Sequence, residues 1–136
     1  MPVIVPDIAE LELLDILVLS WGDTLVLKLY RNDLTPGPAT ELGDFNDANY
    51  SGYAAQEPEN WTAPVDDGTG RAISEADTLT FTHNGGGVAN NVYGYYVVNA
   101  GGDLLWCERF GTAPLVMASA ADSFTLRPKL TLRSQF

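Results

Sequence analysis

The residues that come closest to a chemical site lie in one acidic turn that begins at Asp47. Asp47, Asn49, Ser51 and Gly52 give the order acid, amide, hydroxyl, glycine, which matches the first half of an EF-hand calcium loop. The glutamate that should complete such a loop is out of register, because Pro58 occupies its position. No flanking helices are expected either. The mismatch therefore argues against a calcium site in the Asp47–Gly52 turn. Calcium binding there stays open as an alternative.

The chain has one histidine, His83, and one cysteine, Cys107. A nucleophile–histidine pair would have to rest on His83 alone, and a reactive thiol needs an electropositive, partly exposed setting. One cysteine and one histidine cannot supply the ligands of a zinc site. We therefore interpret both side chains as structural. We predict no catalytic residue, no cofactor and no metal, and hence a protein that is not an enzyme.

Two further patterns are weak. The run of residues 84–90, Asn-Gly-Gly-Gly-Val-Ala-Asn, resembles a phosphate cradle but lacks the Lys-Ser/Thr of a P-loop, so a hairpin loop is the better interpretation. Asp66-Asp67-Gly68 forms a second acidic turn. In a chain with 18 acidic residues, such clusters arise without a ligand. Because acidic residues are so numerous, a glycosidase-type pair of carboxylates can be neither excluded nor located.

Composition narrows the classes of partner. Eighteen acidic and seven basic residues give a net charge of −11, so the chain lacks the basic footprint of a generic nucleic-acid binder. Hydrophobic residues make up 46% of the 136 positions, which argues against disorder. No apolar run reaches the roughly 18 residues of a membrane span. We expect a folded domain with neither a direct nucleic-acid partner nor a membrane partner.

The charges are segregated along the chain. Residues 1–67 carry thirteen acids and two bases, whereas residues 109–136 carry four bases and one acid. Three of those bases, Arg127, Lys129 and Arg133, share one parity of the final predicted strand. This basic strand face either stays solvated, pairs with the acidic half of the same chain, or docks on an acidic neighbouring subunit.

One helix is expected near the N-terminus, from Asp7 to Val18. Apolar residues recur there at helical spacing, and Asp7 with Glu10 fits a capping box. The apolar stripe consists of Ile8, Leu11, Leu14 and Val18, and we expect Leu13, Ile16 and Leu17 to widen it.

The rest of the chain predicts strands. The expected strands are 25–30, 79–82, 92–98, 103–110, 115–118 and a final strand from 124 onward that Pro128 places at an edge or interrupts. Residues 39–76 are mostly irregular, with one or two short strands, one of them near 52–56. The fold class is mainly β, an antiparallel sandwich or barrel-like domain. Residues 1–22 form an arm and helix, and residues 23–136 form a single antiparallel β domain.

Whole segments of the chain resemble a family of small structural proteins encoded among the virion genes of tailed bacteriophages. None of the matching segments is a catalytic motif. They are the opening Pro2-Val-Ile-Val-Pro6, Leu25-Val-Leu-Lys-Leu-Tyr-Arg-Asn-Asp-Leu-Thr-Pro36, Tyr50-Ser-Gly-Tyr-Ala-Ala-Gln56, Asn91-Val-Tyr-Gly-Tyr-Tyr-Val-Val98, Leu104-Leu-Trp-Cys-Glu-Arg-Phe110 and Pro128-Lys-Leu-Thr-Leu132.

The resemblance implies a capsid decoration (cement) protein. Such a protein docks on the outer surface of the phage head, binds the major capsid protein and bridges its subunits, commonly as a homotrimer. The expected location is the virion surface, after synthesis in the cytoplasm of the bacterial host. Polarity and position make six residues the candidate contacts: Val3, Ile4, Val5, Arg127, Lys129 and Arg133.

One alternative stays open at this point. The chain could instead be a tail, baseplate or fibre component with a receptor-binding or adaptor role. In that case the Asn/Gly-rich loops at 46–52 and 84–91 would form the binding surface.

Overall fold

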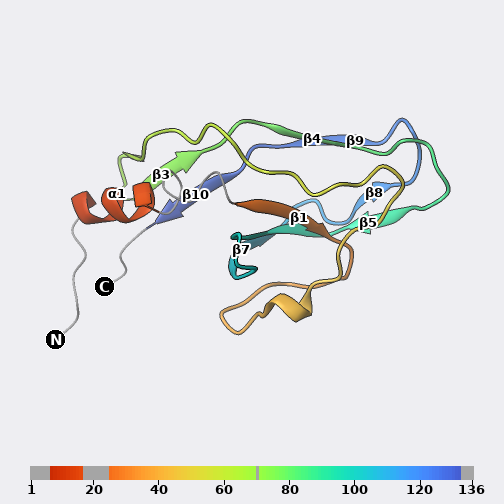
Figure 1. Cartoon of the computed structure of the whole chain (residues 1–136), viewed down its shortest axis with the longest axis horizontal. Helices are drawn as coiled ribbons and strands as arrows, with labels where there is room; N and C mark the ends of the chain where they lie inside the picture. The colour runs from red at the N-terminus through yellow and green to blue at the C-terminus, as the bar shows by residue number, and fades with distance from the viewer. Residues whose placement is uncertain (1–6, 17–24, 70, 133–136) are drawn as a thin grey trace. The chain divides into compact units, whose positions relative to one another are not determined.

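The computed structural model describes residues 7–16, 25–69 and 71–132. Within them the chain is mainly β, with ten strands in several antiparallel sheets and one short α-helix (Figure 1). The chain divides into two compact units. Unit 1 takes the helix with the described residues of 58–79 and 126–132, and unit 2 takes residues 25–57 and 80–125. The expected division at residues 22/23 stays a prediction.

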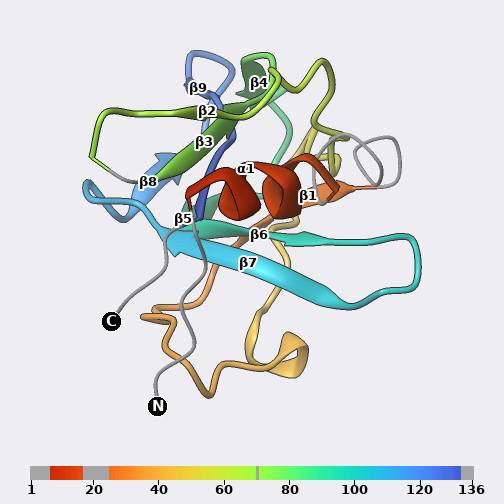
Figure 2. The ribbon, with the colours of Figure 1, turned by 90° about the vertical axis from the view of Figure 1, so that its left-hand side faces the viewer.

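Unit 2 is built on one three-stranded sheet. Its strands are β1 (Val26–Tyr30), β6 (Gly94–Val98) and β7 (Leu104–Arg109), in the order β1-β6-β7. Every residue of β6 is buried, as befits the central strand of the sheet, and β6 confirms most of the strand predicted at 92–98. Figure 2 shows β6 and β7 side by side, joined by the predicted turn at residues 99–102. Gly102 has a φ of +84°, a conformation that glycine adopts at no steric cost.

Two short sheets complete the β structure around this sheet. β4 (Leu79–Thr82) pairs with β9 (Ser123–Leu126), and β5 (Asn90–Val92) pairs with β8 (Leu115–Met117), as Figure 1 shows. The ring of Phe124 on β9 lies 5.7 Å from that of Phe110, which in turn lies 6.1 Å from Tyr95 on β6. Aromatic side chains thus join two β layers. A sandwich fits this arrangement, and none of the described sheets closes into a barrel.

The predicted strand 92–98 is interrupted at Tyr93, between β5 and β6. Strict alternation along residues 92–98 would place Tyr93 and Tyr95 on one face and Tyr96 on the other, and the structure differs. Tyr93 packs with the cluster that contains Tyr30 and Tyr96, whereas Tyr95 contacts Phe110. The strict alternation of side chains holds only along a continuous strand, and the break at Tyr93 cancels it.

Unit 1 contains α1 (Asp7–Asp15), which packs on the sheet β10-β3-β2. The strands are β10 (Lys129–Leu132), β3 (Ala72–Glu75) and β2 (Val65–Asp66). The predicted helix is confirmed. Its extension beyond residue 16 and the capping side chains lie outside the described residues.

The predicted width of the apolar stripe on α1 is wrong. Leu14 is fully buried, but Leu13 and Ile16 are 51% and 50% exposed. Successive helical residues are about 100° apart around the axis, so these two side chains point away from the sheet under Leu14. The sheet contacts only a narrow stripe of the helix. Leu17 lies outside the described residues.

Two predictions about irregular regions have mixed outcomes. Pro128 interrupts the last strand between β9 and β10, as expected. Residues 39–76 hold two short strands, β2 and β3, and a 3-10 turn at Leu42–Asp44. The strand expected near 52–56 is only a single bridge, in which Leu27 and Gln56 exchange N–H···O bonds of 2.8 and 3.1 Å. Here the chain crosses the edge of β1 without running along it.

Candidate functional site

The predicted calcium-like turn is tied to the glycine-rich loop by hydrogen bonds. Asn90 donates from Nδ2 to Asn49 Oδ1 (2.9 Å), and the Asn49 N–H donates to Asn90 Oδ1 (2.7 Å). The Val88 N–H donates to Ser51 Oγ at 2.9 Å. The side-chain oxygens of Asn49 and Ser51, which would be calcium ligands in an EF-hand, thus accept hydrogen bonds from the other loop. They hold the loops 46–52 and 84–91 together.

The acid of the same turn is also engaged. The Tyr96 hydroxyl donates a hydrogen bond to a carboxylate oxygen of Asp47. Burial, followed by this contact with a carboxylate, raises the pKa of Tyr96. Within the described residues no group of three or more His, Cys, Asp and Glu side chains is arranged to hold a metal ion. The turn therefore has a structural role, because it joins its loop to the central strand β6.

His83 is buried, with 1% of its surface exposed. The Gly85 N–H donates to its Nδ1 at 2.9 Å, so Nδ1 is the acceptor of a neutral ring and Nε2 carries the proton. Nε2 then donates to the Val88 carbonyl at 2.8 Å. One face of the ring stacks on Tyr50, with centroids 5.8 Å apart. Both nitrogens are used to shape the following loop, which agrees with the structural interpretation.

The backbone amides of the glycine-rich loop are likewise occupied. Besides the bond from Gly85 to His83, the Gly86 N–H donates to Asn84 Oδ1 at 2.9 Å. A phosphate cradle needs such amides to point outward, toward an anion. In this loop they satisfy neighbouring side chains, so the predicted hairpin-loop interpretation fits the structure.

Cys107 lies on β7 opposite Tyr96 and packs against the aromatic cluster around Tyr30. Burial raises the pKa of its thiol. A raised pKa lowers the thiolate fraction, and the thiolate is the nucleophilic form. The environment of Cys107 thus works against reactivity.

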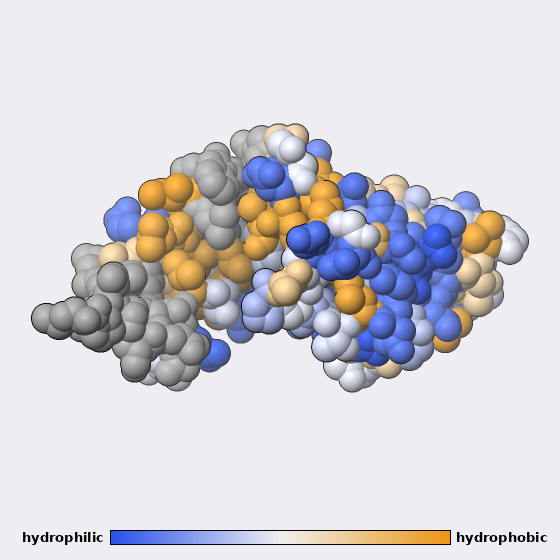
Figure 3. Space-filling model, turned by 90° about the horizontal axis from the view of Figure 1, so that it is seen from below, coloured by the Kyte–Doolittle hydropathy of each residue, from blue (hydrophilic) through white to orange (hydrophobic). Residues whose placement is uncertain are grey.

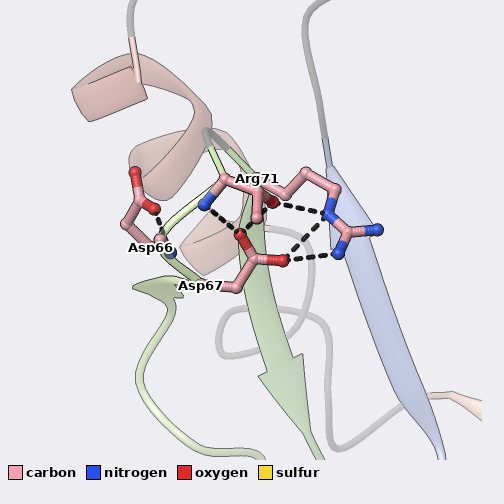
Figure 4. Close-up of polar contacts among 5 residues, drawn as sticks. Asp66, Asp67 and Arg71 are labelled. Carbon is pink, nitrogen blue, oxygen red and sulfur yellow. Dashed lines mark hydrogen bonds and ion pairs between the residues drawn. The ribbon is translucent and has the colours of Figure 1, made fainter.

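The second acidic turn is closed on itself (Figure 4). Asp66 accepts the Gly68 N–H at 2.7 Å, while Asp67 Oδ1 accepts the Thr69 N–H (2.9 Å) and the Thr69 hydroxyl (2.6 Å). Asp67 Oδ2 binds the guanidinium of Arg71 through Nε and Nη2, both at 2.8 Å. These contacts make a rigid exposed hairpin.

The Asp67 carboxyl group is expected to titrate well below the usual pKa of an aspartate. The hydrogen bonds from Thr69, and then the charge of Arg71, lower its pKa to about 2. A lowered folded pKa stabilises the protein above the unfolded value of about 3.9, and that contribution is lost as the pH falls through 2. A carbon-detected NMR titration should show a midpoint near 2, and Thr69→Ala should raise it. A midpoint near 3.9 in the wild type would contradict the geometry.

The structure describes two of the six candidate contact residues, Arg127 and Lys129, and they differ in their ion pairing. Arg127 Nη1 pairs with Glu75 Oε2 at 2.9 Å, and its Nε donates to the Ala76 carbonyl at 3.0 Å. Arg127 thus pairs within its own chain, but with Glu75 and not with the acidic half, residues 1–67, that the sequence pattern pointed to. Lys129 is exposed on β10, in register with Glu75. The other four residues, Val3, Ile4, Val5 and Arg133, lie outside the described part of the chain.

Sequence reasoning missed a groove in unit 2. Its volume is about 440 Å³ and it carries two cations, Lys28 and Arg31. The other lining residues are Leu42, Phe45, Asn46, Asp47 and Tyr96. The outward parity of Lys28 on β1 is the only signal in the sequence, because the wall of the groove is an irregular loop that no periodicity predicts.

No protein-family model, curated protein or solved structure matches the chain. In the part of the chain that the structure describes, no helix is both long and apolar enough to cross a membrane.

Proposed function

We propose that this chain is a structural virion protein of a tailed bacteriophage, a decoration protein that binds the outer surface of the head and bridges capsid subunits. The resemblance of its segments to that family carries the proposal. Three of those segments, 25–36, 91–98 and 104–110, supply the neighbouring strands β1, β6 and β7 of one sheet. The resemblance thus coincides with the framework of unit 2.

The use of the polar side chains supports a structural role. The side chains that could most readily take part in catalysis or metal binding instead hold a loop or a turn in place. They are His83, Asp47, Asn49 and Asp67. A protein that braces a shell needs such rigid loops, because ordering a loop on binding costs free energy.

An exposed apolar surface in unit 1 supports docking on a partner. Leu13 on α1, Ile16 just after it and Val65 on β2 are each about half exposed, and α1 and β2 lie against each other. Figure 3 shows apolar residues gathered over this part of the surface. Contiguous exposed apolar residues commonly mark interaction sites.

A binding experiment tests the proposal directly. Purified full-length protein is mixed with tailless heads of the encoding phage, and binding is followed by co-sedimentation and electron microscopy. We expect saturable binding and density at symmetric positions on the shell. If the protein stays in the supernatant at micromolar concentration, the proposed function is wrong.

The basic strand face makes a specific prediction within this assay. Replacing Arg127, Lys129 and Arg133 together with serine should weaken head binding roughly fivefold, because Lys129 and Arg133 would each lose an exposed ion pair worth about 0.5 kcal/mol, whereas Arg127 is already paired with Glu75. The weakening should shrink as salt is added, since salt already screens the wild-type contacts. Occupancy that matches the wild type at every salt concentration would show that these bases do not contact the shell.

The alternative role in the tail, baseplate or fibre is favoured by one observation. The loops 46–52 and 84–91 lie together and are fastened by the Asn49–Asn90 pair, so they form a rigid polar surface suited to a receptor. Binding to tailless heads favours the decoration role. Binding to host cells in its place would favour the tail.

A further inference from the structure

We propose that the groove lined by Lys28 and Arg31 binds an acidic peptide segment of the partner, with a carboxylate against the two cations and an adjacent apolar side chain against Leu42 and Phe45. This rests on the proposed function for the identity of the partner, which is then the capsid protein. The chemistry of the groove itself does not depend on that identity.

The first argument is the distribution of cations. Three described cations form ion pairs with acids of the same chain: Arg71 with Asp67, Arg109 with Asp33, and Arg127 with Glu75. The other three described cations, Lys28, Arg31 and the exposed Lys129, have no described carboxylate within ion-pair distance, although the chain carries eighteen acids. Of these three, Lys28 and Arg31 line the same groove. Two cations left without an anion in one place favour an anionic ligand.

The second argument is how the groove holds its own acid. Asp47 is the acidic residue in the lining, and its carboxylate accepts the Tyr96 hydroxyl. Arg31 donates from Nε to the Asp47 main-chain carbonyl at 2.9 Å, not to the carboxylate. This bond anchors the guanidinium at the groove while its terminal nitrogens make no ion pair within the described residues.

The third argument is the apolar part of the lining. The Phe45 ring stacks on Tyr96 with centroids 4.4 Å apart and planes 16° from parallel, so it is fixed in place. Leu42 is 41% exposed beside it. A fixed apolar wall next to cations suits an acidic residue flanked by a large apolar one, because neither the ring nor the loop has to be ordered on binding.

The surroundings favour a peptide over a nucleic acid. A phosphate backbone would bring many negative charges toward a protein of net charge −11, whereas a short acidic segment brings two or three. We therefore assign the groove to a carboxylate-bearing peptide.

NMR of the ¹⁵N-labelled full chain tests the groove. The probe is acetyl-Glu-Leu-Asp-Phe-Glu-amide, and the control peptide carries Gln and Asn in place of the acids. We expect shift changes confined to residues 28–31, 42–47 and 96. Lys28→Gln and Arg31→Gln should each weaken binding at least fivefold. Lys129→Gln removes the same charge from an exposed site in unit 1 and should leave peptide binding unchanged.

Several results would overturn the inference. If the neutral peptide binds as tightly as the acidic one, the cations have no role in binding. If Lys129→Gln weakens peptide binding as much as Lys28→Gln or Arg31→Gln, the effect comes from the net charge of the protein and not from the groove. Tighter binding of a single-stranded oligonucleotide would replace the peptide with a phosphate ligand. If the protein forms oligomers that the acidic peptide dissociates, the occupant of the groove is a second copy of this chain.

The head-binding assay separates this inference from the proposed function. If the wild type binds heads and the double variant Lys28→Gln/Arg31→Gln binds at least tenfold more weakly, the groove is a capsid contact. Arg71→Gln serves as the charge control there. If the double variant binds like the wild type, the groove inference is wrong and the proposed function stands. If the wild type does not bind heads, the proposed function fails and the capsid is not the partner.

Discussion

Replacing Gly94 with alanine is expected to destabilise the protein by about 3 kcal/mol or more, or to prevent folding. Gly94 is the first residue of the central strand β6, paired with Tyr30 on one side and Arg109 on the other. A Cβ at this position would lie 2.7 Å from Tyr30 Oη and 2.8 Å from Tyr30 Cε1. It would also collide with the main-chain carbonyl oxygen of Glu108.

These neighbours cannot move aside. The Tyr30 ring is fully buried, and its hydroxyl donates to the Leu34 carbonyl at 3.0 Å. The Glu108 carbonyl belongs to β7, which is held in register along β6. Relief of the clash would require either separation of two strands or loss of the Tyr30 hydrogen bond. Both costs fall on the core of unit 2.

Urea unfolding followed by tryptophan fluorescence measures the effect. Gly111→Ala is the matched control, because a Cβ there has no neighbour within 4 Å and its φ is not positive. The control should change the unfolding free energy by less than about 0.5 kcal/mol. A Gly94→Ala protein as stable as the control would show that β6 and β7 do not approach as closely as described.

The strands were predictable where side chains alternate over an uninterrupted run. Leu25, Leu27 and Leu29 are fully buried while Val26 and Lys28 are half-buried, as the period of two requires, although Tyr30 at the end of the strand is fully buried on the face of Val26 and Lys28. The break at Pro128 was predictable for a different reason, because a missing N–H cannot join a ladder. In both cases the cause lies within a few residues of the effect.

Features that depend on distant segments could not be predicted. The burial of Leu14 without Leu13 and Ile16 depends on which stripe of α1 meets the sheet β10-β3-β2. The turn at Asp47 resembles a calcium loop because acids, amides and hydroxyls are also good partners for a neighbouring loop. Only the approach of Asn90, 41 residues away, shows which of the two uses applies.

The groove shows the same limit. Lys28 could be placed on the outer face of its strand from the sequence, but Leu42, Phe45 and Asp47 come from a loop without periodicity. Conversely, the basic strand face was visible in the sequence, yet the pairing of Arg127 with Glu75 required the register of β10 with β3. Local pattern identifies candidate charges, and the fold decides which of them remain available.

The second large effect is expected at His83, where alanine should cost about 3 kcal/mol of stability. The cost comes from the loss of a buried ring and from the loss of its hydrogen bonds with the Gly85 N–H and the Val88 carbonyl. The ring receives the Gly85 N–H and donates to the Val88 carbonyl, and Val88 in turn donates to Ser51. The alanine variant should therefore also loosen the contact between the loops 46–52 and 84–91, so that amide hydrogen exchange at Val88 becomes faster.

Two comparisons make this prediction decisive. His83→Gln keeps an N–H that can reach the Val88 carbonyl, so it should lose less stability than His83→Ala. Thr80→Ala changes an exposed residue on β4, the strand that ends just before His83, and should have little effect. A structural histidine requires that the unfolding free energy and head binding both fall in His83→Ala while amide exchange in the loop 84–91 becomes faster. If His83→Ala stays as stable as Thr80→Ala and yet abolishes head binding, His83 belongs to a binding site and the structural interpretation of the ring is wrong.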